Sequence, residues 1–212
     1  LYGLYEFKKS SQKFNQLLIV EGYMDVIALA QMGIRNAVAT LGTATSSSHL
    51  SRLFRLVPEV VFCFDGDKAG RTSAWRALEA TLAQMEDGRQ AKFLFLPEGE
   101  DPDTLVRRIG QEKFNEELRL STPLETFFFD KLSVGIDVTT MEGKARLSNL
   151  AKPHLKQLPH GVYGQLMQGR LAELLGISSE ALNKLLDSPD DKQTARSNSF
   201  APPEAPDNTA YD

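Results

Sequence analysis

Short apolar runs alternate with amphipathic segments over the first 110 residues. Four short apolar runs have the composition of buried strands and cover residues 16–22, 36–40, 59–64 and 91–97. Each run is followed by a segment with apolar residues at helical spacing, and glycine, serine or proline marks the boundaries. Nearly continuous apolar strands are typical of sheets that helices cover on both faces. The sequence therefore predicts an α/β fold with an open parallel sheet flanked by helices.

The pattern changes at about residue 111. From there to residue 187 the segments are amphipathic at helical period, which predicts an all-helical subdomain. The last 25 residues carry Pro202, Pro203 and Pro206 among many polar side chains, a composition typical of a disordered linker or tail. We therefore expect three regions, namely an α/β domain at 1–110, a helical subdomain at 111–187 and a tail at 188–212.

The charge of the chain argues against binding nucleic acid through a broadly basic surface. The formal net charge is −4, of which the tail contributes −3, so residues 1–187 carry −1. Proteins that bind nucleic acid by bulk charge are usually basic. A role on nucleic acid must therefore depend on a local site or on a basic surface supplied from elsewhere. No apolar run approaches the roughly 18 residues of a membrane span, so we expect no membrane contact.

Cys63 is the only cysteine of the sequence. One cysteine forms no internal disulfide and no cysteine-based zinc site. It stands inside the third apolar run, where a small buried side chain is expected. The scarcity of cysteine favours an intracellular protein.

Acidic side chains gather where the predicted strands end. They are Glu21 after the first strand, Asp25 one turn into the next helix, Asp65 and Asp67 after the third strand, and Asp101 and Asp103 after the fourth. In parallel α/β sheets the carboxyl ends of the strands share one edge, and ligands bind beyond it. Like charges at close range cost free energy unless a cation lies among them. We therefore expect the six acids to converge on a cation.

The residue types at this edge favour Mg²⁺ or Mn²⁺ over zinc. Carboxylate oxygens without histidine or cysteine are hard ligands, and His49, His154 and His160 lie elsewhere in the sequence. An acid cluster that holds such ions suits phosphoryl or nucleotidyl transfer. We expect Lys68, Arg71 and the N-terminus of the helix they begin to contact a phosphate.

Three motifs resemble those of a known family. They are VEGYMD (20–25), FDGDKAGR (64–71) and EGEDPDTLV (98–106), and their order and separation resemble the Toprim module. The stretches LIVEGYMDVIALAQMGIRNAVATLGT and GEDPDTLVRR are similar to the bacterial replicative DNA primase of the DnaG type. The resemblance covers nearly all of residues 1–187. It implies a Toprim-type sheet followed by the helical subdomain of the primase polymerase core.

The resemblance implies an enzyme, a DNA-directed RNA polymerase that makes short RNA primers from ribonucleoside triphosphates on a single-stranded DNA template. Divalent metal in the Toprim site, Mg²⁺ or Mn²⁺, would be its cofactor. By motif position Glu21, Asp65 and Asp67 match the catalytic acids, which also bind metal. Further acids of the metal centre are matched by Asp25, Asp101 and Asp103.

The complete family protein has further parts that we do not expect in this chain. They are an N-terminal zinc-binding domain, a basic half of the polymerase domain, and a C-terminal domain that binds the replicative helicase. We therefore expect a monomeric fragment, from a protein of the bacterial cytoplasm, that is weakly active or inactive by itself. Zinc is expected only in the absent domain.

Other functions stay open on the sequence. Another Toprim enzyme, such as a topoisomerase or nuclease, would share the acids, but a topoisomerase needs a nucleophilic tyrosine, and nothing around Tyr163 marks it as activated. A phosphatase with a strand-end DxD would use its first aspartate as the nucleophile. Such an enzyme usually has Thr or Val where this chain has Ala69, and it would leave Glu21 without a role. A non-catalytic module that binds a metal ion and a partner protein is the third alternative.

Overall fold

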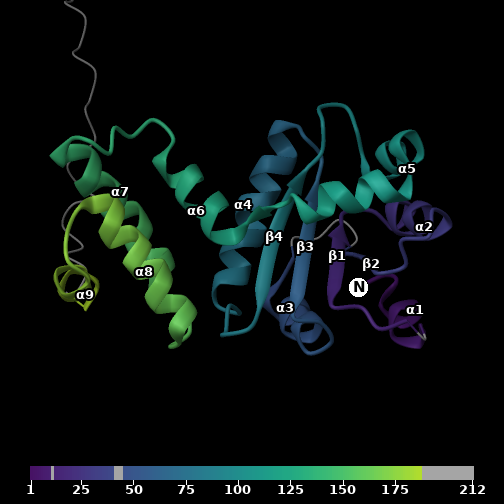
Figure 1. Ribbon diagram of the computed structural model, residues 1–212, viewed down its shortest axis with the longest axis horizontal. Helices are drawn as coiled ribbons and strands as arrows, with labels where there is room; N and C mark the ends of the chain where they lie inside the picture. Colours follow the sequence, from purple (N-terminus) through teal and green to yellow (C-terminus); the bar gives the residue numbers. More distant parts are fainter. Residues whose placement is uncertain (11, 41–44, 188–212) are drawn as a thin grey trace, which may run out of the picture.

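The computed structural model describes residues 1–10, 12–40 and 45–187, so the predicted tail at 188–212 lies outside the described residues. At its centre is a mixed sheet with the strand order β2-β1-β3-β4-β5 (Figure 1). The strands are β1 (Gln16–Val20), β2 (Ala37–Ala39), β3 (Glu59–Phe64), β4 (Gln90–Phe95) and β5 (Thr122–Pro123). The first four are parallel, which confirms the predicted α/β sheet.

Helices connect these strands and then continue beyond the sheet. They are α1 (Leu4–Lys9), α2 (Tyr23–Gln31), α3 (Ser47–Phe54), α4 (Lys68–Leu82), α5 (Pro102–Arg119), α6 (Leu124–Ser133), α7 (Met141–Leu155), α8 (Val162–Leu175) and α9 (Ser179–Asp187). No helix in the described ranges combines the length and the apolar sequence needed to cross a membrane.

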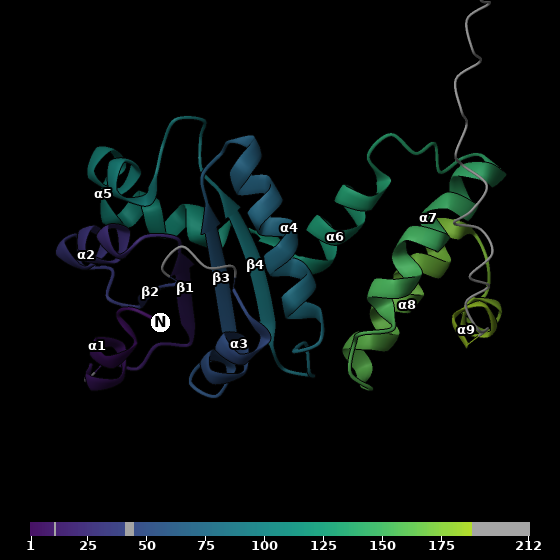
Figure 2. The same cartoon turned by 180° about the vertical axis from the view of Figure 1, so that it is seen from behind.

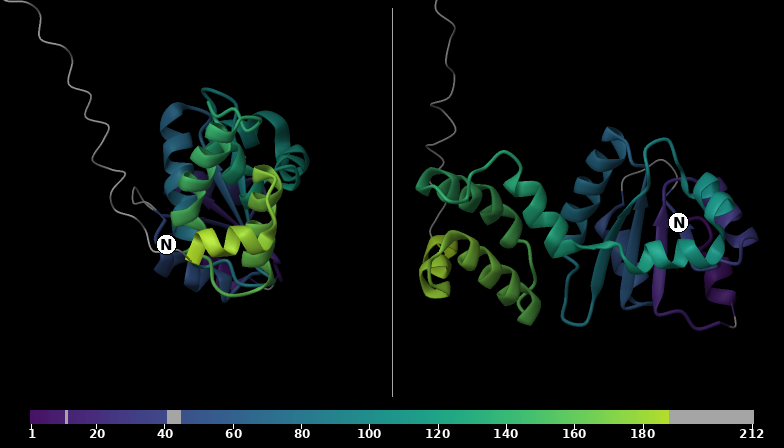
Figure 3. Two further views of the ribbon diagram at one scale, coloured as in Figure 1. Left: turned by 90° about the vertical axis from the view of Figure 1, so that its left-hand side faces the viewer. Right: turned by 45° about the horizontal axis from the view of Figure 1, so that its top comes forward.

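Side chains that alternate along the strands build one core on each face of the sheet. On one face, Val61 and Cys63 of β3 pack in a core with residues of α2 and α5. On the other face, Phe62 and Phe64 pack with residues of α3 and α4. Figure 3 shows these helices on opposite sides of the sheet. The strands are apolar throughout because both faces are covered.

One feature of the sheet differs from the sequence prediction. We expected no strand after residue 111, but β5 pairs antiparallel with Lys92 and Phe93 of β4. A two-residue strand has no apolar run, so it leaves no pattern in the sequence. Helix α5 also runs across residue 110, with a kink at Gly110, and its Phe114 and Leu118 belong to the core under the sheet. The domain boundary at residue 110 therefore stays a prediction.

Helices α6 to α9 form a layer beside the sheet rather than over it (Figure 2). Phe127, Phe128 and Phe129 of α6 are buried and join the core of α4 to that of α7 and α8. The turn before β4 makes a second link, since Asp87 accepts hydrogen bonds from the backbone N–H groups of Val162 and Tyr163 at 3.0 and 2.8 Å. This carboxylate therefore caps α8 from the sheet side.

Candidate metal centre

The order in which strands are added to the sheet reverses between β1 and β3. Strand β2 lies on one side of β1, and β3, β4 and β5 follow on the other side. Ligands in such sheets bind beyond the carboxyl ends of the strands at this switch point. The register pairs Ile19 with Phe62, Glu21 directly follows β1, and Asp65 directly follows β3. The two acids are therefore placed side by side at the switch point.

Gly66 brings the turn after β3 against the loop after β4. A Cβ on Gly66 would collide with the carbonyl oxygen of Leu96 and lie 2.9 Å from the backbone nitrogen of Glu98. The close approach of this second loop is the constraint that requires glycine at this position. The contact holds the Asp65–Asp67 turn beside the loop that leads to Asp101.

Three of the acids cap the helices that begin at this edge. Asp25 accepts a hydrogen bond from the Gly22 N–H at 3.1 Å, and Asp67 accepts one from the Gly70 N–H at 2.7 Å. In addition, Asp101 accepts a hydrogen bond from the Thr104 N–H at 2.7 Å, and the Thr104 hydroxyl accepts one from the Asp101 N–H at 3.0 Å. Asp103 pairs with Arg107. These four acids have structural partners in addition to any role toward a ligand.

Glu21 and Asp65 differ from the other four acids. Their side chains accept no hydrogen bond and form no ion pair with any residue that the structure describes. The pKa of Glu21 is raised by burial, and then by the charges of Asp65, Asp25 and Asp67. Burial likewise raises the pKa of Asp65, and Asp101 and Asp67 add to the effect. Two carboxyls without partners therefore face other negative charges.

The electrostatic interactions extend over the whole set of six acids. The pKa of Asp25 is raised by burial, against the hydrogen bond from Gly22, and the charges of Asp101, Asp65 and Asp103 raise it further. The six acids therefore lie within electrostatic range of one another, while their convergence on a cation stays a prediction. Which of them bind a ligand stays a prediction.

The donor set suits a hard divalent cation. Carboxylate oxygens dominate this edge, and the nearby thiol of Cys63 is fully buried with a pKa well above its usual value, raised by burial and by the neighbouring acids. Mg²⁺ and Mn²⁺ prefer such oxygen ligands. The carboxylates stand apart, however, since within the described residues no three His, Cys, Asp or Glu side chains are grouped closely enough to hold a metal ion. The oxygen ligands and the excess negative charge suit a cation. The described acids do not, however, form a complete set of metal ligands by themselves.

Two basic residues stand at the start of α4, as the sequence predicted. Lys68 is the first residue of the helix and is exposed, and Arg71 lies one turn further on. The guanidinium carbon of Arg71 lies 5.0 Å from the centroid of the Phe95 ring. Neither side chain forms an ion pair with a described residue. The contact of Phe95 with Arg71 was not predicted from sequence, because an apolar residue at a strand end looks like ordinary core.

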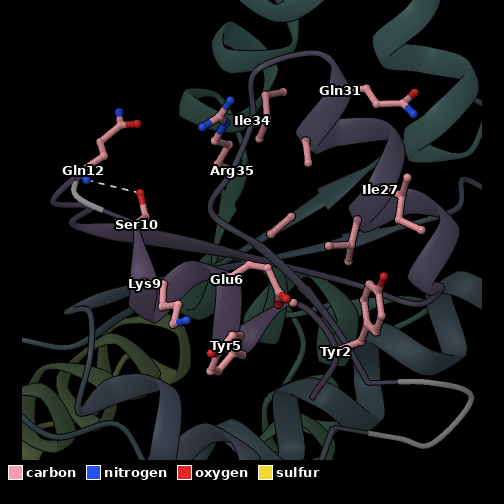
Figure 4. Close-up of a pocket in the computed structure, with 14 residues that line it drawn as sticks. Tyr2, Tyr5, Glu6, Lys9, Ser10, Gln12, Ile27, Gln31, Ile34 and Arg35 are labelled. Atoms are coloured by element: carbon pink, nitrogen blue, oxygen red, sulfur yellow. Dashed lines mark hydrogen bonds between the residues drawn. The ribbon is translucent and has the colours of Figure 1, made fainter.

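A pocket of about 910 Å³ lies away from these acids, between α1 and α2 at the outer side of β2. Figure 4 shows Tyr2, Tyr5, Ile27 and Arg35 around it. None of the six acids lines this pocket. Its lining residues follow no motif, so this pocket could not be predicted from sequence. The candidate centre is therefore placed at the acids and not at this pocket.

Tyr163, the tyrosine considered as a nucleophile, lies at the opposite end of β4 from the acids. Its backbone N–H binds Asp87, which precedes Gln90 at the start of the strand, while Asp101 follows the end of the strand. Burial and the charge of Glu125 raise the pKa of the Tyr163 hydroxyl. A raised pKa disfavours the phenolate, so Tyr163 is poorly suited to attack a phosphate together with these acids.

Two family models match the chain. The model described as the Toprim domain matches residues 15–94, which include β1, β2, β3, all but the last residue of β4, and the first four acids. The model described as the DnaB-helicase binding domain of primase matches residues 126–180 in α6 to α9. This second match differs from our expectation that the chain contains no part described as helicase-binding.

Known proteins and structures similar to the chain are DNA primases. The DNA primase of Pseudomonas putida is 55% identical over 186 residues, which are 87% of this chain and 28% of that protein. A DNA primase domain from Pseudomonas aeruginosa has a TM-score of 0.85 and 53% identity, over 88% of this chain and 58% of that one. A DnaG primase catalytic domain bound to single-stranded DNA has a TM-score of 0.77 and 49% identity, over 81% of this chain and 56% of that one. The chain thus spans less than a third of the length of its curated relative.

Proposed function

We propose that this chain, which belongs to the bacterial DNA primase family, supplies the metal-binding part of an enzyme that makes short RNA primers. The substrates would be ribonucleoside triphosphates, and the template would be single-stranded DNA in the bacterial cytoplasm. The relatives named DNA primase support this proposal. Because the chain spans 28% of the Pseudomonas putida protein, the activity of a whole primase is itself part of the proposal.

The convergence of Glu21 and Asp65 at the switch point carries the proposal. Both carboxyls lack partners among the described residues, and burial and neighbouring acids raise the pKa of each. A purely structural acid would be expected to cap a helix or pair with a cation, as Asp101 and Asp103 do. Retaining two unpaired acids costs stability, which is characteristic of functional sites.

We assign the roles below on the support of the side-chain positions. Mg²⁺ or Mn²⁺ held by these acids would neutralise charge on the attacking and leaving oxygens during nucleotidyl transfer. Asp65 and Asp67 would bind the ion, and Asp25, Asp101 and Asp103 would complete its surroundings. Glu21 would either bind the ion or accept the proton of the attacking hydroxyl at its carboxylate, since its raised pKa makes it the more basic for this task. Lys68 and Arg71 would orient the phosphates from the start of α4.

The partners are proposed on separate grounds. A similar primase domain is described as bound to single-stranded DNA, which supports the template. The match of residues 126–180 to a model described as helicase-binding supports contact with the replicative helicase. This match also favours a second candidate function, in which α6 to α9 act as a docking module and the acids bind a structural ion.

Paramagnetic Mn²⁺ tests the metal centre directly. We expect NMR signals near Glu21, Asp65 and Asp67 to broaden selectively in the wild-type chain, and the effect to weaken in Asp65→Asn/Asp67→Asn. Broadening scattered over surface acids, unchanged in the double variant, would refute the metal centre. Primer synthesis on a single-stranded template by a full-length primase carrying Glu21→Gln, against its wild type, then separates catalysis from a structural ion. A fully active variant would favour the docking module.

A further inference from the structure

Arg71 carries a positive charge at the edge of the sheet where the parallel strands end. No described residue forms an ion pair with this charge. Its backbone N–H donates to the Asp67 carbonyl at 3.2 Å, so it is fixed within the first turn of α4. Its guanidinium forms no ion pair there and lies over the face of the Phe95 ring, 5.0 Å from the centroid. A guanidinium held over a ring face keeps the N–H donors that point away from the ring available for an anion.

The ring of Phe95 is itself held by two other rings, and we call Phe64, Phe95 and Phe127 the aromatic platform. Phe95 is the last residue of β4 and pairs in register with Phe64 of β3, with ring centroids 6.4 Å apart. Phe127 of α6 packs against Phe95 at 5.2 Å and against Phe93 at 4.8 Å. Contacts from a strand and from a helix together restrict the rotation of the Phe95 ring.

The aromatic platform adjoins the candidate metal centre. Phe64 immediately precedes Asp65, and Phe95 immediately precedes Leu96, whose carbonyl lies against Gly66. The acids that raise the pKa of Asp65 are Asp101 and Asp67, and no hydrogen bond or ion pair joins Asp65 to Arg71. The guanidinium therefore lies at the same sheet edge as the acids but forms no ion pair with any of them.

We propose that Phe95 is a positioning residue whose ring face holds the Arg71 guanidinium ready to bind a phosphate oxygen of the incoming nucleotide. This inference rests on the proposed nucleotidyl-transfer function. It assigns a role to an apolar strand-end residue outside the acid motifs. It also links α6, which supplies Phe127, to nucleotide binding at the sheet edge.

The test is NMR titration of the chain with ATP in the presence of Mg²⁺, for a set of variants. Phe95→Leu removes the ring and keeps an apolar side chain, and Phe95→Tyr restores a ring face. Phe93→Leu is the matched control because it removes a ring of the same cluster that does not contact Arg71. Arg71→Ala removes the charge. Thermal unfolding of each variant reports the loss of packing separately from the loss of affinity.

We expect Phe95→Leu to weaken ATP binding by about threefold to tenfold, since a cation–π contact at such sites contributes on that order. Phe95→Tyr should bind within twofold of wild type, and Phe93→Leu should lose thermal stability with unchanged affinity. In the Arg71→Ala background, Phe95→Leu should have no further effect on affinity, because its role acts through Arg71. The δ protons of Arg71 should also lose their upfield ring-current shift in Phe95→Leu.

Three results would overturn the proposal. Equal losses from Phe95→Leu in the wild-type and Arg71→Ala backgrounds would make Phe95 merely structural. Unchanged ATP affinity in Phe95→Leu would remove its role altogether. If the wild type fails to bind ATP while Mn²⁺ still broadens signals near Asp65, the phosphate assignment fails and the metal centre survives. Absence of both ATP binding and localised Mn²⁺ broadening would instead count against the proposed function itself.

Discussion

Asp65→Asn should make the metal-free chain more stable, although it removes an acid of the candidate centre. The carboxyl of Asp65 has no hydrogen-bond partner among the described residues, and burial and the charges of Asp101 and Asp67 raise its pKa. A raised pKa means that folding favours the protonated form. The stability contribution is therefore present below the ordinary pKa of 3.8 and is lost as the pH rises through the raised value in the folded chain.

The size of the effect follows from the partial exposure of the site. Relief of a local charge conflict commonly stabilises by about 0.5–2 kcal/mol, and solvent screening at a half-buried carboxyl favours the lower part of that range, about 0.5–1 kcal/mol. For a chain of this size we expect a rise in Tm of about 1–4 °C at pH 7. Saturating divalent metal reverses the order, since a ligand at 100 times its Kd stabilises the wild type by about 2.7 kcal/mol.

The assay is thermal unfolding of both proteins at pH 7 and at pH 3.5, with EDTA and with Mn²⁺. The variant should melt higher in EDTA at pH 7, melt lower in Mn²⁺, and lose its advantage at pH 3.5. Asp103→Asn is the control, because it breaks the ion pair with Arg107 and should not stabilise the chain. A variant that melts below the wild type in EDTA at pH 7 would refute the argument that the acids repel one another.

Three further outcomes are expected. Gly66→Ala should lower stability by about 1–3 kcal/mol in urea unfolding, because its methyl group would collide with the Leu96 carbonyl; an unchanged midpoint would contradict the close approach. Asp87→Ala should destabilise the chain at pH 7 but much less below pH 3, because the hydrogen bonds from Tyr163 and Val162 lower the pKa of Asp87 and stabilise its charged form; urea midpoints against pH measure this. Asp101→Ala should cost about 0.5–2 kcal/mol and Asp101→Asn much less, since asparagine also caps a helix; equal losses in chemical unfolding would exclude capping as the cause.

The parallel sheet was predictable because its signal is local and repeated. Each apolar run is long enough to form a strand. Their alternation with helical segments allows only a few topologies. The pairing of Lys92 and Phe93 with β5 left no such signal, because two extended residues are defined by their partner strand and not by their own side chains. The prediction of a purely helical region after residue 111 therefore missed an edge strand.

The acids were located from sequence because parallel strands place their carboxyl ends together. What the sequence did not reveal is how differently the acids are used. Asp67 and Asp101 cap helices, whereas Glu21 and Asp65 have no partner among the described residues, and this distinction depends on side-chain geometry. The contact of Phe95 with Arg71 joins the end of β4 to the start of α4, so no spacing rule within one segment predicts it.

Because Cys63 is buried, the rate at which a thiol reagent modifies it reports how often the sheet opens. Cys63 is 2% exposed, it lies in β3 two residues before Asp65, and the sequence contains no other cysteine. A thiol reagent can react only when β3 separates from its neighbours or the helices above it lift away, so the labelling rate measures the free energy of that opening. Any ion that binds the acids next to β3 would slow the reaction in proportion to its affinity. Ligand binding at this edge can thus be read from the rate of alkylation of one unmodified side chain.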